Sequence, residues 1–384
     1  MLNIATEAKM KHKLKVLIIV PKFEYGGLNL VAIRLQQALD KNKFECVYYV
    51  VNSEDSSENP IESKLCDTGL KIIHKPEKIH SYLKSYFYLK KLFKQENFDI
   101  VHCHLPFYSG IVMMAAKRSG IKKRIAHSHY SSPIVLMHSK LKMILATIYR
   151  IIMRKIIGHF STDIIGCSYN AGVFLCGKRE FNQKGIILNN GIDTGKYRFD
   201  TEKRKSKRKD LGIENDIVLG HIGQMYYVKN QSFLIDIFYE FQKCYENSVL
   251  LLIGDGTDKD KLMLKVKSLG INDKVRFLGF RNDIPELLMA MDCFVFPSLH
   301  EGFPLTLIEA QASKLPCVVS DTITDKTKLN SNFSFISINQ DAQFWCREIE
   351  KQLNEDRTNV DISRVVCEFD INNVVKKLED IYLS

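Results

Sequence analysis

The sequence predicts an α/β protein built from two doubly wound parallel-sheet units. Short runs rich in β-branched and aromatic residues alternate with segments in which apolar residues recur at helical spacing, as in Leu28, Val31, Leu35 and Leu39. Such alternation favours parallel strands joined by helices that cover both faces of a sheet. A chain of 384 residues is long enough for two domains, each with its own core.

Six buried strands are expected in each half of the chain. They span 14–20, 46–51, 100–103, 124–127, 163–167 and 186–188 in the first half, and 217–222, 249–253, 275–278, 293–296, 316–319 and 335–338 in the second. Between the halves lies the polar, basic segment 201–210, which indicates a linker or the exposed start of a helix. A ligand is expected at the carboxyl ends of the strands, between the two units.

Composition narrows the function classes. The ten cysteines include no Cys-x-x-Cys pair, so neither a disulfide framework nor a zinc knuckle is indicated, and a reducing, cytoplasmic compartment fits best. The first residues lack the apolar core of a signal peptide. No apolar run reaches the ~18 residues that a membrane-spanning helix needs.

Charge is distributed unevenly along the chain. Residues 1–200 contain 31 Lys and Arg against 16 Asp and Glu, a net charge of +15, whereas residues 201–384 contain 24 against 28, a net charge of −4. The stretch 133–160 combines apolar residues with Lys140, Lys142, Arg150, Arg154 and Lys155. This pattern favours binding to an anionic membrane surface over the alternative, a core helix with a basic polar side.

The most informative stretch carries Glu301 and Glu309. A short buried strand precedes a turn that holds Glu301, and Pro304 opens an apolar helix that holds Glu309. A helix N-terminus offers unpaired N–H groups to a phosphate or diphosphate, and Gly302 lets the backbone approach closely. Two carboxylates beside such a site suit neutral hydroxyl groups on the same ligand, which indicates a nucleotide-sugar.

Three further loops follow predicted strands. Gly26 and Gly27 lie where the first strand gives way to a helix. Either their amides face a phosphate or approach the substrate closely, or the pair forms an ordinary turn that needs positive φ. Lys229 can place a point charge on a diphosphate, although most lysines are simply solvated. Asp255, between two glycines, suits a close ligand or a tight turn.

Histidines cluster at the ends of two strands of the first half. His102 and His104 end one strand, and His127 and His129 end the next. Because no third carboxylate or cysteine stands at ligand spacing, a polar active-site role is favoured over a metal site. A structural hydrogen bond is an equally good explanation for any one of them.

These motifs together resemble the signature of retaining nucleotide-sugar glycosyltransferases of the family 4 type, particularly those of bacterial capsule and exopolysaccharide assembly. The resemblance rests on HEGFPLTLIEA at 300–310, on the loops at Gly26–Gly27, Gly223 to Asn230 and Gly254–Gly256, and on IVHCH, AHSH and NGID in the first half. It implies the GT-B fold, two Rossmann-like domains that face a cleft. Residues 1–197 would form the acceptor- and membrane-facing domain, with 368–384 packing back on it, and residues 198–367 the donor domain.

The resemblance also implies roles. Glu309 would bind the ribose, Glu301 the transferred sugar, and His129 would lie near the nascent bond. Lys229 and the backbone near Phe303, Pro304 and Leu305 would hold the diphosphate, with Gly302, Gly26 and Gly27 close by. Gln224 stands where the family usually has an arginine that clamps the diphosphate.

The expected reaction is transfer of a sugar from a UDP- or GDP-sugar to a lipid-linked oligosaccharide, with retention, without metal or another cofactor, at the inner face of the plasma membrane. The acceptor would be a polyprenyl-diphosphate-linked glycan or another glycan. A second hypothesis is an epimerase or hydrolase of nucleotide-sugars with the same fold. A third is a basic membrane- or nucleic-acid-binding protein, but the sequence lacks a recognisable RNA module, so nucleic acid is not an expected partner.

Overall fold

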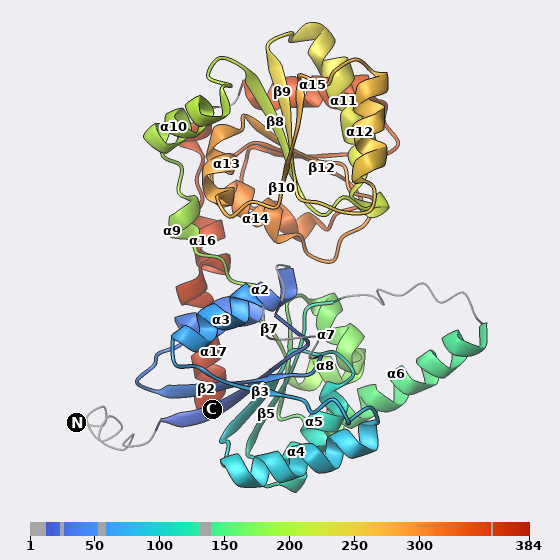
Figure 1. Ribbon diagram of the computed structural model, residues 1–384, viewed down its shortest axis with the longest axis vertical. Helices are drawn as coiled ribbons and strands as arrows, with labels where there is room; N and C mark the ends of the chain where they lie inside the picture. The colour runs from blue at the N-terminus through green and yellow to red at the C-terminus, as the bar shows by residue number, and fades with distance from the viewer. Residues whose placement is uncertain (1–12, 24–26, 53–58, 131–139, 355) are drawn as a thin grey trace. The chain divides into compact units, whose positions relative to one another are not determined.

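The computed structural model describes residues 13–23, 27–52, 59–130, 140–354 and 356–384. The chain divides into two compact units (Figure 1), unit 1 with residues 1–191 and 371–384 and unit 2 with residues 192–370. The sequence predicts these boundaries at 197/198 and 367/368, a few residues away.

Unit 1 is a twisted parallel sheet between helices. Its described strands lie in the order β3-β2-β1-β4-β5-β6-β7. They are β1 Leu14–Val20, β2 Phe44–Val50, β3 Lys71–His74, β4 Ile100–Cys103, β5 Lys123–Ser128, β6 Asp163–Gly166 and β7 Gly185–Ile187. From β1, the strands that follow in the sequence are added first on one side, as β2 and β3, and then on the other, from β4 onward. Rossmann-like folds bind their ligand at this reversal of strand order, between β1 and β4.

The helices of unit 1 cover both faces of this sheet (Figure 1). They are α2 Gly27–Ala38, α3 Pro60–Asp67, α4 Tyr82–Glu96, α5 Ser109–Arg118, α6 Lys140–Phe160, α7 Tyr169–Cys176, α8 Lys178–Lys184 and α17 Ile371–Leu383. The last helix returns to unit 1 from the far end of the chain and packs beside α2. Glu379 accepts a hydrogen bond from the Asp40 amide at 2.8 Å, which ties α17 to the loop before β2.

Unit 2 repeats the plan with a sheet of order β10-β9-β8-β11-β12-β13. Its strands are β8 Ile217–Ile222, β9 Ser248–Ile253, β10 Val275–Gly279, β11 Cys293–Phe296, β12 Cys317–Ser320 and β13 Phe333–Ile336. The main helices are α10 Thr201–Leu211, α11 Gln231–Cys244, α12 Lys259–Ser268, α13 Ile284–Ala290, α14 Leu305–Ala312, α15 Ala342–Leu353 and α16 Ser363–Phe369, with the short α9 Thr194–Tyr197 at the start. Successive residues of one strand, such as Val218 and Leu219, enter separate cores on the two sheet faces.

The basic segment 201–210 is a helix, so the alternative of a linker is wrong. Asp200 caps the start of α10 by accepting from the Glu202 and Lys203 amides, and Gly212 ends it with φ +58°. Arg204 and Arg208, one helical turn apart, both reach Asp292. Helical periodicity is hard to recognise here because arginines, not apolar residues, form the buried face of α10.

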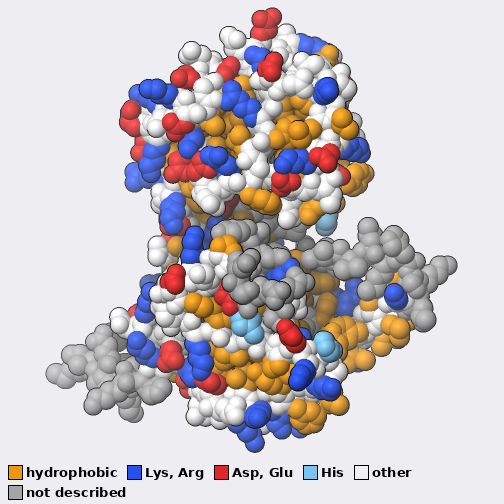
Figure 2. Space-filling view, in the orientation of Figure 1, with side chains coloured by type: hydrophobic (Ala, Val, Ile, Leu, Met, Phe, Trp, Pro, Cys, Tyr) orange, Lys and Arg blue, Asp and Glu red, His pale blue; other side chains and the backbone are white. Residues whose placement is uncertain are grey.

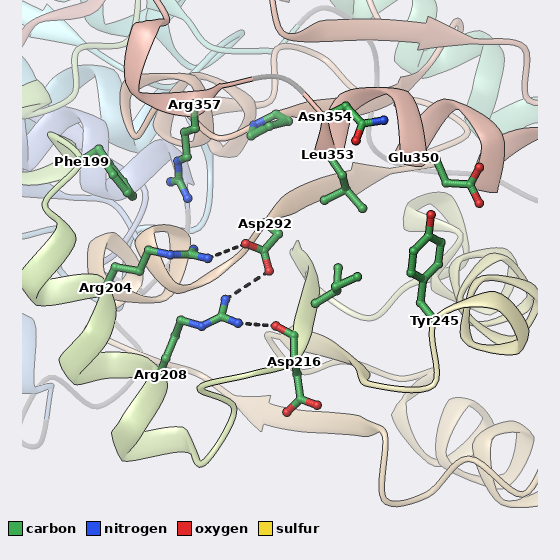
Figure 3. A pocket seen from close by; sticks show the side chains of 12 residues that line it. Phe199, Arg204, Arg208, Asp216, Tyr245, Asp292, Glu350, Leu353, Asn354 and Arg357 are labelled. Atoms are coloured by element: carbon green, nitrogen blue, oxygen red, sulfur yellow. Dashed lines mark hydrogen bonds and ion pairs between the residues drawn. The ribbon is translucent and has the colours of Figure 1, made fainter.

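Figure 3 shows these arginines in a pocket of about 540 Å³ at the amino ends of the unit 2 strands. Arg204, Arg208 and Arg357 each donate, at 2.8 Å, to one of three successive backbone carbonyls, those of Met289, Ala290 and Met291 respectively. Cations at the C-terminal end of a helix satisfy its unpaired carbonyls and its negative dipole end. The three arginines therefore stabilise the end of α13.

One strand of unit 1 was not expected from the sequence. The edge strand β3 contains only Lys71, Ile72, Ile73 and His74, and none of these side chains is fully buried. Four residues without alternating burial give too little periodicity to predict a strand. None of the helices in the described part of the chain is long and apolar enough to cross a membrane.

Candidate active site

The candidate site of unit 2 forms where β8 and β11 lie side by side. These strands are neighbours in the sheet, but β9 and β10 separate them in the sequence, so the strand order reverses between them. The carboxyl ends of strands at such a reversal form the ligand crevice of doubly wound sheets. The loop after β8 carries Lys229, and the turn after β11 carries Glu301.

Lys229 and Glu301 are bound to each other. Lys229 Nζ lies 2.6 Å from Glu301 Oε1, and both side chains are largely buried. Lys229 Nζ also lies 5.5 Å above the ring centre of Phe296, at the end of β11. The sequence predicts a diphosphate contact for the lysine and a sugar contact for the glutamate, and the structure brings the two residues to one place.

Backbone contacts hold the two loops together. The Leu299 amide donates to the Val228 carbonyl at 2.8 Å, and Asn230 Nδ2 donates to the Pro297 carbonyl at 3.1 Å. Asn230 itself adopts a left-handed conformation with φ +56°, which asparagine tolerates better than most residues. The position of Lys229 is therefore fixed by the backbone as well as by its ion pair.

The helix α14 opens directly after this turn. Pro304 occupies its N-cap position, and no side chain caps the helix in the described structure. No capping side chain among the described residues therefore competes for the first amides of α14, near which the sequence predicts an anion site from Gly302 to Leu305. Glu309 lies one turn into α14 and is buried, with 7% of its surface exposed.

His221 supports the site from beneath and was missed from the sequence. Its Nδ1 lies 3.0 Å from the Val295 carbonyl, so it carries the proton there, and its ring stacks on Phe296 at 5.3 Å. Gln231 Nε2 contacts His221 Nε2 at 3.5 Å and donates to the Gln224 carbonyl at 3.0 Å. Burial lowers the pKa of His221 to about 4, so the ring is neutral. The sequence shows only a histidine in an otherwise apolar strand, which does not reveal this supporting role.

The glycines near Asp255 are explained by loop packing. A Cβ on Gly254 would lie 2.2 Å from the Gly223 carbonyl oxygen, and one on Gly256 would lie 2.5 Å from that of Met225. The Asp255 carboxylate binds Lys259 at 2.8 Å and accepts from the Gly256 amide. The hydrogen bond from Lys259, followed by that from Gly256, lowers the pKa of Asp255. These described contacts are those of a tight turn.

The remaining predicted residues are placed as follows. Gln224 is exposed at the end of β8, and its backbone rather than its side chain takes part in the Gln231 contact. Gly27 begins α2, after β1, and Gly26 lies outside the described residues. Phe303 stacks on Phe369 at 5.6 Å.

In unit 1, four histidines gather on one face of the sheet. His102 pairs with Ile125 in the register of β4 and β5, which puts His127 beside His104, with His129 just beyond the end of β5. The ring centres of neighbouring histidines lie 4.1–5.2 Å apart. The sequence predicts this gathering, since both pairs end adjacent strands.

Two hydrogen-bond chains run through this cluster. In one, His129 Nδ1 donates to Asn190 Oδ1 at 2.9 Å, which leaves His129 Nε2 to accept from His104 Nδ1, also at 2.9 Å. In the other, His102 links the Tyr382 hydroxyl at 2.7 Å to His127 Nδ1 at 3.1 Å. Both ring nitrogens of His129 are thus engaged within unit 1.

The same cluster contains a possible metal-ligand group. Ligand atoms of His102, His104 and His127 lie within 4.8 Å of one another. However, His102 and His127 bond each other, so a metal would have to replace that hydrogen bond. Burial, and then the neighbouring imidazoles, holds the pKa of His104 and His127 well below the usual range. The rings are neutral and form a hydrogen-bonded polar cluster.

Two family models match this chain. The model described as "Glycosyltransferase Family 4" matches residues 25–196, and "Glycosyl transferases group 1" matches residues 203–364. The chain belongs to these glycosyltransferases. The resemblance seen in the motifs is therefore confirmed. The first match covers most of unit 1 and ends five residues into unit 2, and the second lies within unit 2.

Two relatives, matched over most of their length, agree with this assignment. The glycosyltransferase is 26% identical over 377 residues to the capsular polysaccharide biosynthesis glycosyltransferase CapH of Staphylococcus aureus, covering 97% of this chain and 99% of CapH. It is 28% identical over 314 residues to UDP-Gal:alpha-D-GlcNAc-diphosphoundecaprenol alpha-1,3-galactosyltransferase of Escherichia coli, covering 79% of each chain.

A solved structure confirms the predicted GT-B fold. Anabaena Alr3699/HepE, crystallised with UDP and glucose, matches the glycosyltransferase with a TM-score of 0.74 at 18% identity. The match covers 97% of this chain and 100% of the other.

Proposed function

We propose that this glycosyltransferase moves a sugar from a UDP- or GDP-sugar to a lipid-linked oligosaccharide, with retention at the anomeric carbon, in capsule or exopolysaccharide assembly. One observation carries the proposal. A lysine and a glutamate, bound to each other at 2.6 Å, lie at the strand-order reversal of unit 2, and the next helix begins without a side-chain cap.

These groups match the parts of a nucleotide-sugar. The first-turn amides of α14 and the ammonium of Lys229 would bind the diphosphate, which is the leaving group and gains negative charge as the glycosidic bond breaks. Glu301 would accept hydrogen bonds from the transferred sugar, and Glu309 from the ribose. The ion pair would orient Lys229 before the donor arrives, so less reorganisation is needed during the reaction.

The same groups support a reaction that needs no metal ion. A helix N-terminus and a lysine together supply positive charge where many transferases use a divalent cation. Gln224 supplies no such charge, so Lys229 would be the main side-chain cation on the diphosphate.

The acceptor assignment rests on unit 1 and on the relatives. The E. coli relative acts, by its name, on a diphosphoundecaprenol-linked sugar. Unit 1 has the matching surface character, with α6 exposing Ile144, Ile148 and Ile151 among basic residues. The enzyme would work as a peripheral protein at the inner face of the plasma membrane. His129, fixed by Asn190, would lie near the acceptor and the transferred sugar.

The decisive experiment is a transfer assay with the full chain. UDP- and GDP-hexoses are incubated with a synthetic undecaprenyl-diphosphate sugar in detergent, and the product linkage is read from the anomeric C–H coupling by NMR. Transfer with the donor configuration kept supports the proposal. An inverted linkage, or an epimer or free sugar formed at full rate without acceptor, contradicts it.

A further inference from the structure

A second pocket, this one in unit 1 and of about 380 Å³, lies at the C-terminal end of α6 against α7 and α8. Its polar lining consists of Arg154, Lys155, His159 and Lys184, with Glu180 as its one carboxylate. The remaining lining residues are Gly158 and Cys176. Burial raises the pKa of the Cys176 thiol to about 12, so it adds no negative charge. The pocket is therefore positively charged.

The cations of this pocket are held in place without being neutralised. Arg154 Nε donates to the Phe174 carbonyl at 3.0 Å, and its guanidinium lies 5.8 Å from the centre of the Phe174 ring. Lys184 Nζ donates to the Ser161 carbonyl at 3.1 Å. Within the described part of the chain, neither these two nor Lys155 forms an ion pair. Their charge is available to an anion.

An apolar stripe on α6 leads to the same pocket. Ile144, Ile148 and Ile151 are about half exposed and recur at helical spacing on one face of the helix. Lys155 and His159 continue that spacing, so the stripe ends at the pocket. Figure 2 shows hydrophobic side chains with Lys and Arg among them over the exposed part of α6.

We propose that this pocket binds the phosphate group of an anionic phospholipid while the stripe lies against its acyl chains. An anionic head joined to a long apolar tail matches a cationic pocket at the end of an apolar stripe. The inference rests on the membrane association in the proposed function and adds to it a defined lipid site. It differs from general attraction between a basic surface and a membrane, because it depends on particular lysines.

Vesicle sedimentation with the full chain tests the proposal. The pocket variant K155Q/K184Q is compared with K142Q/R150Q, which removes the same charge from α6 outside the pocket. Binding is measured on phosphatidylcholine vesicles with and without phosphatidylglycerol. We expect the pocket variant to lose about tenfold more affinity for the anionic vesicles than the control variant, because it loses direct hydrogen bonds to the phosphate. Equal losses would mean diffuse attraction and would overturn the proposal.

Two further arms identify the source of the phosphate. Inorganic phosphate and chloride are added at matched ionic strength. This separates competition by phosphate for the pocket from general screening of charge by salt. Displacement by phosphate alone at modest excess would show a free-phosphate site and overturn the lipid assignment. Vesicles with undecaprenyl phosphate in place of phosphatidylglycerol should bind more weakly, and stronger binding would reassign the pocket to the lipid carrier.

Folding and catalysis are followed separately. Thermal unfolding and UDP titration should be the same for both double variants, and the single variant K155Q serves if Lys184 proves necessary for folding. Transfer to a detergent-dispersed acceptor reports on the proposed function without vesicles. Unchanged vesicle binding by the pocket variant defeats the lipid site alone, whereas absent transfer by the wild-type chain defeats the proposed function alone.

Discussion

Lys229 Nζ and Glu301 Oε1 lie 2.6 Å apart, although the two residues are separated by 72 positions in the sequence. The pair joins the loop after β8 to the turn after β11, and two backbone-directed hydrogen bonds fix the same junction. A cation and an acceptor are thus oriented together at the carboxyl edge of the sheet.

Replacing Lys229 should slow transfer strongly. K229M removes the side-chain cation that would stabilise the leaving diphosphate, and we expect kcat/KM to fall by ~10²–10³, equivalent to about 2.7–4 kcal/mol. E301Q keeps the lysine and should spare UDP affinity while weakening binding of the intact UDP-sugar. Calorimetry with UDP and with UDP-sugar separates the two effects. Wild-type kinetics in both variants would make the pair purely structural.

Glu309→Ala should weaken donor binding through the nucleoside. Loss of two charge-assisted hydrogen bonds to the ribose is expected to cost ~2–4 kcal/mol. Because the ribose is common to UDP and UDP-sugar, both should lose affinity equally, in contrast to E301Q. Donor affinity unchanged in calorimetry would remove Glu309 from the nucleotide site, with circular dichroism as the control for folding.

Gln224→Arg should tighten donor binding. The side chain of Gln224 is exposed, and its backbone makes the contact with Gln231, so the change leaves the packing intact. A guanidinium on the diphosphate is expected to contribute ~1.5–3 kcal/mol, about a tenfold gain in UDP affinity or more. Y227R adds the same charge at a neighbouring exposed residue and serves as the control. An equal gain in both variants would indicate general attraction instead of a clamp.

Transfer should be insensitive to chelation. Since Lys229 and α14 would supply the positive charge on the diphosphate, EDTA is expected to leave kcat unchanged. The measurement is the initial rate before and after dialysis against EDTA, followed by addition of magnesium or manganese. Activity that disappears and returns with one of these ions would contradict this expectation.

Stability should fall as the pH falls from about 6.5 towards 4. Burial lowers the pKa of His102 to about 3 and of His129 to about 4, whereas an unfolded histidine titrates near ~6.5. Over that interval the unfolded chain binds more protons, so acidification favours unfolding, by at most ~1.4 kcal/mol per pH unit for each histidine. Urea unfolding at several pH values measures this slope.

Variants assign that slope to the cluster. H127Q removes one buried imidazole. The slope of the unfolding free energy against pH should therefore decrease by an amount equivalent to about one proton taken up on unfolding. H80Q, at an exposed histidine outside the cluster, serves as the control for the substitution itself. A wild-type unfolding free energy that is constant from pH 7 to 5 would contradict the depressed pKa values.

Most of the fold could be predicted because its strands carry strong local signals. Leu14–Val20, Ile100–Cys103, Ile217–Ile222 and Cys293–Phe296 have the same bounds in the sequence analysis and in the structure. Fully buried parallel strands are continuous apolar runs, which are easy to recognise. The edge strand β3 and the arginine-faced helix α10 lack such runs, since an edge strand is half solvated and α10 packs through guanidinium groups.

The position of the candidate site residues could be predicted in part, but their partners could not. Glu301, Glu309 and Lys229 follow from motif and position at strand ends. Lys229 pairs with Glu301, and His102 pairs with Tyr382. In both pairs the residues lie far apart in the sequence, and only tertiary packing brings them together. His221 and Gln231 act by supporting a loop, a role that no local pattern marks.

The return of α17 to unit 1 has a consequence for how the protein is made. Tyr382, which bonds His102, lies 280 positions after it in the sequence, so during synthesis the histidine cluster of unit 1 is completed only after all of unit 2 has been made. Unit 2 is continuous in sequence, so its fold does not depend on a segment that is synthesised after another unit. Nascent chains that end before Ile371 therefore expose to chaperones and proteases the surface of unit 1 on which α17 packs.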